Sequence, residues 1–559
     1  MLINLLRFVA LIGALVFVHE FGHFMWAKLF NVKVLKFSLG FGPRVVGYRH
    51  QETDYCVSLV PLGGFVKMLG EDPSDHVAPE DIPRSFHKQR LWKRFVIVLA
   101  GPLMSLVFPV LLYFVVFLGQ TDLTAPVIGT VVPGMPAEGR LLPGDRVLSI
   151  DDRAVNSFQD IREAVAAAAG HELRFVVQRG EQTVTARVTP EAVRVEHALD
   201  IVEVAGRAGI SAGFALPVIA VRGTGTPAAV AGLRTFDLVT MYAGTPIRRR
   251  TDLDRVLQTS RGATVPVGFL RPRAVEGALG GLLDLEVFDP GLAQITPEPG
   301  ANEVARRTGI ENPDLYVSDV SPTSPEYQMG LRRGDRIVSV DGVSPASWER
   351  FHEGIMAGGR DLRTLRFLHD GREAQGAFSL RPTSWTDEFG QRYVRIAFET
   401  RNWVPTDAEP PIDNPAPTLY ALRAALRQTT EAVRFLSTGI VRVLQGRVSI
   451  RTVGGPIMIY DVTRSTAPDG LWGFLWLMAL VSINLGLVNL LPIPTLDGGH
   501  LLFFVVEGVI RRPVPLWIRQ TASVMGLLVV VGVMCIAFKN DLQRKFGRAA
   551  PIVVTAPAR

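Results

Sequence analysis

The sequence predicts an α-helical integral membrane protein with about four transmembrane helices and inserted extracytoplasmic α+β domains. Apolar segments long enough to cross a bilayer lie near both ends of the chain, and the region between them repeats one pattern about every 95 residues. The composition agrees with this class. At 48% hydrophobic residues the 559-residue chain is too apolar for an ordinary soluble enzyme, and at 20% charged residues it is too polar for a pure membrane bundle.

The four expected membrane spans are Leu2 to Phe24, Phe95 to Leu118, Leu471 to Leu491 and Arg519 to Phe538. The first span resembles a signal peptide, but no small-x-small cleavage site follows it. Basic residues are frequent in the loop after the first span, so the positive-inside rule places that loop in the cytoplasm. Arg511 and Arg512 agree with this orientation, whereas Lys539, Arg544 and Lys545 argue against it.

The first span contains His19-Glu20-Phe21-Gly22-His23. Histidines four residues apart share one face of a helix, so both imidazoles can bind one metal ion while Glu20 reaches a water molecule there. Ionisable residues inside a membrane segment are costly and usually functional. The alternative is a short kinked helix with polar residues at a wet interface.

The third span ends in Asn489-Leu-Leu-Pro-Ile-Pro-Thr-Leu-Asp497-Gly-Gly-His500. Two prolines must break the helix, and irregular backbone at membrane depth is tolerated only where it lines a cavity. Because the first and third spans run in the same direction, Asp497 is expected at the depth of His19 and His23. It is therefore the natural third ligand of a catalytic zinc with one open position, although it could also cap the following helix.

HEFGH, the GGPI stretch at Gly454 to Ile457 and NLLPIPTLDGGH together resemble the site-2 protease family of intramembrane zinc metalloproteases, of the bacterial regulator-of-sigma-E protease type. The resemblance implies that His19, His23 and Asp497 bind Zn²⁺, that Glu20 is catalytic and that Asn489 helps to hold the substrate. It also implies a bacterial inner-membrane location and single-span substrates such as anti-sigma factors. Related proteins tend to carry Asn where this chain has Ser105. The resemblance therefore does not say which polar group the second helix contributes.

Tyr55 to Met68 has strand-forming residues on both sides of a Pro-Leu-Gly-Gly turn signal and is expected to form a hairpin. Beside a membrane active site, the edge of this hairpin at Gly63 and Gly64 can hold an extended substrate strand. The alternative is a loop packed for stability.

Three stretches, beginning at Pro133, Gly225 and Ser321, repeat a strand, a short helix, a turn and an Asp before an apolar strand. They resemble PDZ domains, although the second has Phe236 where the others have Gly144 and Gly334. The modules either bind peptide C-termini or act as a size filter over the active site, and the filter is favoured because no clear carboxylate-binding loop recurs in all three.

The expected divisions of the chain are a membrane region with HEFGH and a cytoplasmic-side hairpin loop at 1–120, PDZ-like domains at 121–192, 193–300 and 301–385, a linker and amphipathic helix at 386–470, a membrane region with the LDGG motif at 471–540 and a tail at 541–559. Thr418 to Gly446 has apolar residues at helical spacing with interleaved arginines, which is typical of a helix lying on the lipid bilayer. The tail is polar and then rich in Ala and Pro, which predicts disorder.

Other classes of function fit less well. The net charge of +6 is spread along the chain without a basic tract interleaved with aromatics, so no nucleic-acid partner is expected. Two distant cysteines exclude a disulfide framework. A transporter would need paired broken helices. The main alternative is a membrane adaptor that recruits partners through its PDZ-like domains and holds a structural metal, which would not require Glu20.

Overall fold

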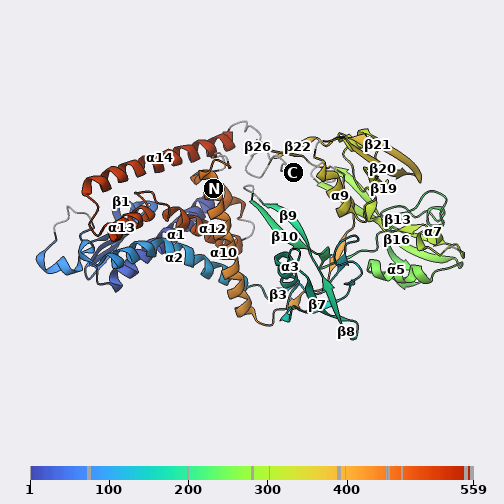
Figure 1. The fold of residues 1–559 in the computed structure, drawn as a ribbon, viewed down its shortest axis with the longest axis horizontal. Coiled ribbons are helices and arrows are strands. Elements are labelled where there is room, and N and C mark those ends of the chain that lie inside the picture. Colours follow the sequence, from blue (N-terminus) through green and yellow to red (C-terminus); the bar gives the residue numbers. More distant parts are fainter. Residues whose placement is uncertain are drawn as a thin grey trace.

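The computed structural model describes residues 2–71, 77–197, 201–277, 283–300, 302–359, 361–386, 392–396, 398, 400–448, 450, 453–466, 470–546 and 552–553. Within these residues four helices are long and apolar enough to cross a membrane, namely α1 (Leu2–Leu29), α2 (Leu91–Leu118), α12 (Gly470–Asn489) and α14 (Leu516–Phe546). All four expected spans are therefore helices, and each is a candidate membrane span by its length and composition. They gather at one end of the molecule, and the repeated modules occupy the other end (Figure 1).

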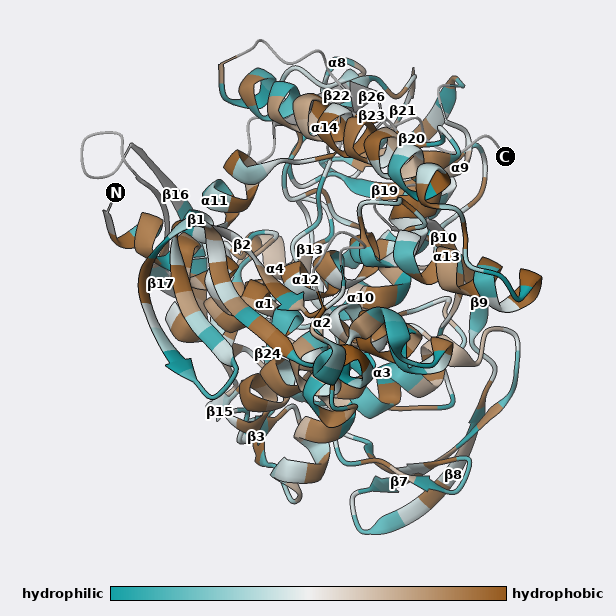
Figure 2. Ribbon diagram, turned by 90° about the vertical axis from the view of Figure 1, so that its left-hand side faces the viewer, coloured by the Kyte–Doolittle hydropathy of each residue, from teal (hydrophilic) through white to brown (hydrophobic). Residues whose placement is uncertain are grey.

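Helix α2 is the centre of the membrane region, because it packs against α1, α12, α10 (Pro417–Leu444) and α13 (Asp497–Ile510). The close contact between α1 and α2 requires a glycine at position 22, because a Cβ there would lie 2.4 Å from the carbonyl oxygen of Ala100. Figure 2 shows apolar residues along α1, α2 and α14. Helix α10 buries its small residues, including Ala421, Ala425 and Gly439, while the larger Leu419, Leu422 and Leu426 stay exposed.

The non-helical segment between α12 and α13 packs closely against the first turn of α13. Pro492 and Pro494 follow Asn489, the last residue of α12, and the chain becomes helical again at Asp497. A Cβ on Gly498 or Gly499 would come within 2.4 Å of carbonyl oxygens in the break. The two glycines are therefore required for the break to fold back on the helix that follows it.

The predicted hairpin at Tyr55 to Met68 is corrected by the structure. The strands are β1 (Val34–His50) and β2 (Thr53–Met68), and Ser38 lies opposite Cys56 on one side and Phe65 on the other. The two arms of the expected hairpin are thus separated by the first part of β1, which pairs with both of them. Sequence periodicity cannot show such an inserted strand. The inserted part of β1 lies outside Tyr55 to Met68, and it supplies the backbone hydrogen-bond partners of both arms.

The chain between α2 and α10 begins and ends at one pair of short strands. Strand β3 (Asp122–Leu123) follows α2 and pairs with β25 (Ile412–Asp413), which precedes α10. Three modules lie between them, each with its own hydrophobic core. The first contains β4 (Thr130–Val131), β5 (Arg146–Ile150), β6 (Arg153–Ala154), α3 (Phe158–Ala167), β7 (Leu173–Arg179), β8 (Gln182–Val188), β9 (Glu191–His197), β10 (Ile201–Arg207) and β11 (Ile210–Ser211). The chain between the first two modules forms β12 (Gly213–Ala215), which pairs with β24 (Thr406–Ala408).

The second module contains β13 (Ala220–Val221), α4 (Pro227–Val230), β14 (Leu238–Tyr242), β15 (Thr245–Pro246), α5 (Arg250–Thr259), β16 (Val265–Gly277), β17 (Leu283–Ile295), α7 (Val304–Thr308) and β18 (Ile310–Glu311). The third contains α8 (Pro325–Gln328), β19 (Arg336–Val340), α9 (Trp348–Ala357), β20 (Arg363–His369), β21 (Arg372–Phe378), β22 (Pro382–Thr386) and β23 (Arg392–Ile396). The central sheets have the orders β6-β5-β7-β8, β15-β14-β16-β17 and β19-β20-β21.

Each module ends later in the chain than the expected boundary. In the first, β11 returns to pair with β4; in the second, β18 returns to β13; in the third, Arg401 bridges to Asp319. The divisions at 192 and 300 therefore cut through modules. These closing strands are only two residues long and show no periodicity, which explains why the sequence did not reveal them.

The repeated aspartates Asp145, Asp237 and Asp335 are structural. Each is buried and accepts a hydrogen bond from the backbone N–H three residues before it. Each also pairs with a side chain 34 residues later in the chain, from Arg179, Arg271 and His369 in turn. The recurrence thus reflects one buried polar contact that holds the turn of every module to its sheet.

Phe236 explains the divergence of the second module. Gly144 and Gly334 have φ of 95° and 91°, and Phe236 keeps a left-handed conformation with φ of 77°. A non-glycine residue there costs roughly 1–2 kcal/mol. The ring is buried with Val218 and Tyr316, and it lies edge-on to Trp403 at 6.4 Å. This packing joins the second module to the start of the third and offsets the strain.

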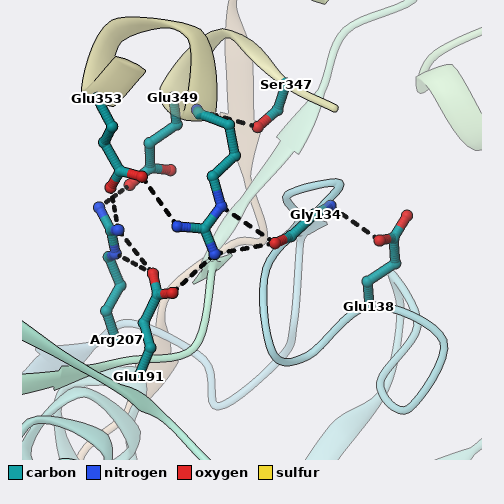
Figure 3. A network of polar contacts seen from close by, with 8 residues as sticks. Gly134, Glu138, Glu191, Arg207, Ser347, Glu349 and Glu353 are labelled. Carbon is teal, nitrogen blue, oxygen red and sulfur yellow. Dashed lines mark hydrogen bonds and ion pairs between the residues drawn. The ribbon is translucent and has the colours of Figure 1, made fainter. Parts of the chain in front are cut away.

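An ion-pair network connects the first and third modules (Figure 3). Arg207, the last residue of β10, donates to Glu191 and to Glu349 and Glu353 of α9. Arg350 of α9 donates in turn to Glu191, Glu353 and the carbonyl oxygen of Gly134. We refer to Glu191, Arg207, Glu349, Arg350 and Glu353 as the module bridge.

Candidate active site

The predicted metal ligands converge in the structure, although they come from opposite ends of the chain. Asp497 Oδ2 lies 3.1 Å from His19 Nε2 and 3.5 Å from His23 Nε2, and the two Nε2 atoms are 3.3 Å apart. Among the described residues this is the one group of three or more His, Cys, Asp or Glu side chains whose ligand atoms all lie within 4.8 Å of one another. Two imidazole nitrogens and one carboxylate oxygen are a suitable donor set for a catalytic zinc ion, and both histidines are buried.

Helix α2 orients both imidazoles. His23 Nδ1 donates to the carbonyl oxygen of Ile97 at 2.9 Å, and His19 Nδ1 lies 3.1 Å from Ser105 Oγ. With Nδ1 occupied in this way, Nε2 of each ring is left to face Asp497. Sequence reasoning missed Ile97, whose contribution is a backbone carbonyl and leaves no signal in the residue type.

Glu20 stands between the histidines and the β1–β2 sheet. Its carboxylate is close enough to His19, His23 and Asp497 to interact electrostatically with all three, and it lies within hydrogen-bonding range of the Val66 backbone. It is not one of the three converging ligands. This is the position expected for a general base that acts on a water molecule rather than on the metal.

The predicted substrate-binding residues lie around the same centre. Asn489 Nδ2 is 3.4 Å from His19 Nε2, at the end of α12. A Cβ on Gly64 would lie 2.7 Å from Val16 and 3.1 Å from Glu20, so the strand passes directly beside α1. Gly63 has φ of 101° at the bend before it. Within the described residues, the segment Gly64–Met68 pairs with β1 on one edge and with no strand on the other.

Apolar helices, a broken third span and converging His, His and Asp side chains next to a glutamate are typical of a membrane-embedded metallohydrolase. Residues 7–533 match the model of peptidase family M50, so the chain belongs to this family, whose members are site-2 proteases.

Full-length relatives agree with the family. A "Putative zinc metalloprotease" of Vibrio cholerae is 28% identical over 547 residues, covering 97% of this chain and 98% of its own. The regulator of sigma-E protease RseP of Salmonella typhimurium is 26% identical over 547 residues with the same two shares. A "Putative zinc metalloprotease" of Neisseria meningitidis is 28% identical over 557 residues, covering 97% of this chain and all of its own.

Proposed function

We propose that this protein is an intramembrane zinc metalloprotease that cleaves the transmembrane segment of single-span membrane proteins. The observation that carries the proposal is the convergence of Asp497 with His19 and His23 beside Glu20, the last three on a helix apolar enough to cross a bilayer. An intact transmembrane helix satisfies its own backbone and resists cleavage, so the substrate is one already shortened by a first cut in its ectodomain. The sigma-E protease relatives favour an anti-sigma factor as substrate.

The residues have distinct roles. Bound zinc would lower the pKa of a water molecule towards neutrality and polarise the scissile carbonyl. Glu20 takes the proton of that water and passes it to the leaving amine. Asn489, beside His19, donates its amide to the substrate backbone, and the edge of Gly64–Met68 that pairs with no strand of the described residues holds the unwound segment as an added strand.

The proposed location is the bacterial inner membrane, with the active site near the cytoplasmic side and the three modules outside the cytoplasm. The basic loop after α1 supports this orientation by the positive-inside rule. The modules then stand on the side from which a substrate ectodomain would approach, which suits a size filter.

Two substitutions test the mechanism. Glu20→Gln keeps the size and hydrogen bonding of the side chain but removes the base, so turnover should fall by roughly a hundredfold or more while zinc stays bound. Asp497→Ala should lose zinc and activity together. The measurement is cleavage of a panel of truncated single-span proteins co-expressed with each variant, alongside the zinc content of the purified protein, which should be about one per chain in the wild type.

The contrast between the two variants separates an enzyme from an adaptor. If Glu20→Gln cleaved a truncated substrate at the wild-type rate, the proposed mechanism would be wrong. Full zinc occupancy in a His19→Ala, His23→Ala double variant would contradict the assigned ligands.

A further inference from the structure

Ser105 lies where α1, α2 and α12 meet, and it contacts the candidate active site through His19. Its side chain is completely buried on α2, and its hydroxyl faces His19 Nδ1 of α1 at 3.1 Å. Its backbone carbonyl accepts a hydrogen bond of 2.7 Å from the hydroxyl of Ser482 on α12. The residue is therefore fixed from two sides before any ligand or substrate is considered.

The direction of the His19 bond follows from the ring's other nitrogen. His19 Nε2 faces Asp497 and His23, and a nitrogen that binds a metal cannot carry a proton. The proton of the neutral ring must then sit on Nδ1, where it needs an acceptor in a buried place. A serine hydroxyl has two lone pairs and can accept it. In His23 the corresponding Nδ1 proton is accepted by the carbonyl oxygen of Ile97.

We infer that Ser105 is a positioning residue for His19, holding the ring in the Nδ1–H tautomer and aiming Nε2 at the metal site. This inference rests on the proposed zinc function. It assigns to α2 a role in metal binding although this helix supplies none of the three predicted ligands, and it gives a purpose to the serine in Ala100-Gly101-Pro102-Leu-Met-Ser105.

The test is zinc affinity of the full-length protein in detergent, measured by competition with a chromogenic chelator. Ser105→Ala removes one oxygen atom from a tightly packed place and should bind zinc about 10- to 100-fold more weakly than the wild type. Ser105→Thr keeps the hydroxyl, and Ser105→Asn supplies an amide oxygen; at least one of them should restore affinity to within a few-fold of wild type. Co²⁺-loaded protein gives a second readout, because its visible absorption bands should shift in Ser105→Ala and return in the rescued variant.

Ser482→Ala is the matched control, since it deletes a hydroxyl of the same size from the same buried cluster without facing an imidazole. It should change zinc affinity by less than about threefold. Wild-type affinity in Ser105→Ala, or an equal loss in Ser482→Ala, would overturn the inference. These results do not depend on proteolysis: a wild-type protein that binds zinc through this arrangement but cleaves no truncated substrate would contradict the proposed function and leave the role of Ser105 standing.

Discussion

Gly101 shows how closely α2 approaches the predicted metal ligands. A Cβ at this position would lie 2.2 Å from His23 Nε2, the atom that faces Asp497. Neither the helix backbone nor the ring can move away without breaking the bond from His23 Nδ1 to Ile97. A single methyl group is therefore sufficient to disturb the site.

Gly101→Ala should displace the His23 ring and weaken zinc binding by at least about tenfold, a loss comparable to that of a missing supporting contact. Chelator competition on the purified variant measures it. Gly13→Ala on α1 is the control, because nothing lies within 4 Å of the added Cβ and alanine is favoured over glycine in a helix by about 1 kcal/mol. Unchanged zinc affinity in Gly101→Ala would mean that the helices separate more easily than their packing indicates.

Glu52, in the turn of the β1–β2 sheet, makes part of the stability depend on pH. The Arg84 guanidinium, helped by Lys28, lowers the pKa of this carboxyl from 4.5 to about 2. The folded state thus binds the proton more weakly than the unfolded state. The stabilisation is present in full above the unfolded-state pKa and is lost as the pH falls through about 2.

Glu52→Gln should lower the thermal unfolding temperature at pH 7, and its difference from the wild type should shrink progressively below pH 4.5. Unfolding curves of both proteins in the same detergent at several pH values give the comparison. Glu181→Gln, at an exposed turn of the first module, is the control for the removal of one negative charge. A difference that stays constant with pH would exclude the ion pairs as its source.

At the scale of elements, the end of α14 is tied to the GGPI stretch. Asp541 is buried and accepts hydrogen bonds from the backbone N–H groups of Gly455, Ile457 and Met458, at the start of α11 (Pro456–Ser465). Asn540 donates to the carbonyl oxygens of Ile450 and Val453. Helix α14 is mostly exposed elsewhere, so these contacts fix its end to the rest of the bundle.

Asp541→Ala leaves three backbone donors without their acceptor and should cost about 2–4 kcal/mol of stability. We expect a lower unfolding temperature and faster trypsin cleavage at Arg447, shortly before the segment that Asn540 and Asp541 hold. Asp461→Ala removes a half-exposed pair with Lys545 and should change stability by less than about 1 kcal/mol. Equal effects of the two substitutions would argue against a specific attachment at Asp541.

At the scale of the whole molecule, the module bridge keeps the first module against the third. Its side chains are partly exposed, so each pair contributes little alone, and the connection depends on several charges acting together. Arg350 contacts the first module twice, at Glu191 and at the carbonyl oxygen of Gly134, and it also pairs with Glu353 of its own helix.

Arg350→Ala should therefore broaden the distance distribution between spin labels at positions 142 and 362, two exposed leucines in the first and third modules. The exposed Cys535 is replaced by serine beforehand, while Cys56 is buried. High salt should act in the same direction. Arg174→Ala breaks an exposed pair with Asp152 inside the first module and should leave the distances unchanged. An unchanged distribution in Arg350→Ala would show that other contacts hold the modules together.

Removal of the modules tests the proposed filter. Because Leu123 and Ile412 are paired neighbours, residues 124–411 can be replaced by a short Gly/Ser linker without separating the spans. Single-span substrates with intact ectodomains should then be cleaved, as seen by immunoblot, whereas the full-length protein should cleave only truncated ones. If intact substrates stayed resistant to the shortened protein, peptide capture by the modules would be favoured instead.

Much of the geometry of the candidate metal site could be predicted from the sequence. His19 and His23 share a face by the geometry of any helix, and Asp497 follows a break that two prolines enforce, so their chemistry depends on covalent spacing and span direction. The number of candidate spans and the repeated Asp-containing turns could likewise be predicted, because each depends on residues close together in the sequence. The positions of Asn489, Gly63 and Gly64 beside the site agree with their expected role, which remains a proposal.

Other features were decided only by contacts between distant segments. The support of His23 by Ile97 and of His19 by Ser105, the strand inserted between the arms of β2, and the late closing strands of the modules all join segments that no local pattern connects. Only the structure showed that Asp145, Asp237 and Asp335 are buried and hydrogen-bonded within the turns of their modules. The physical reason is that periodicity reports which face of one element is buried, whereas pairing and hydrogen-bond partners depend on which other elements the folded chain brings alongside.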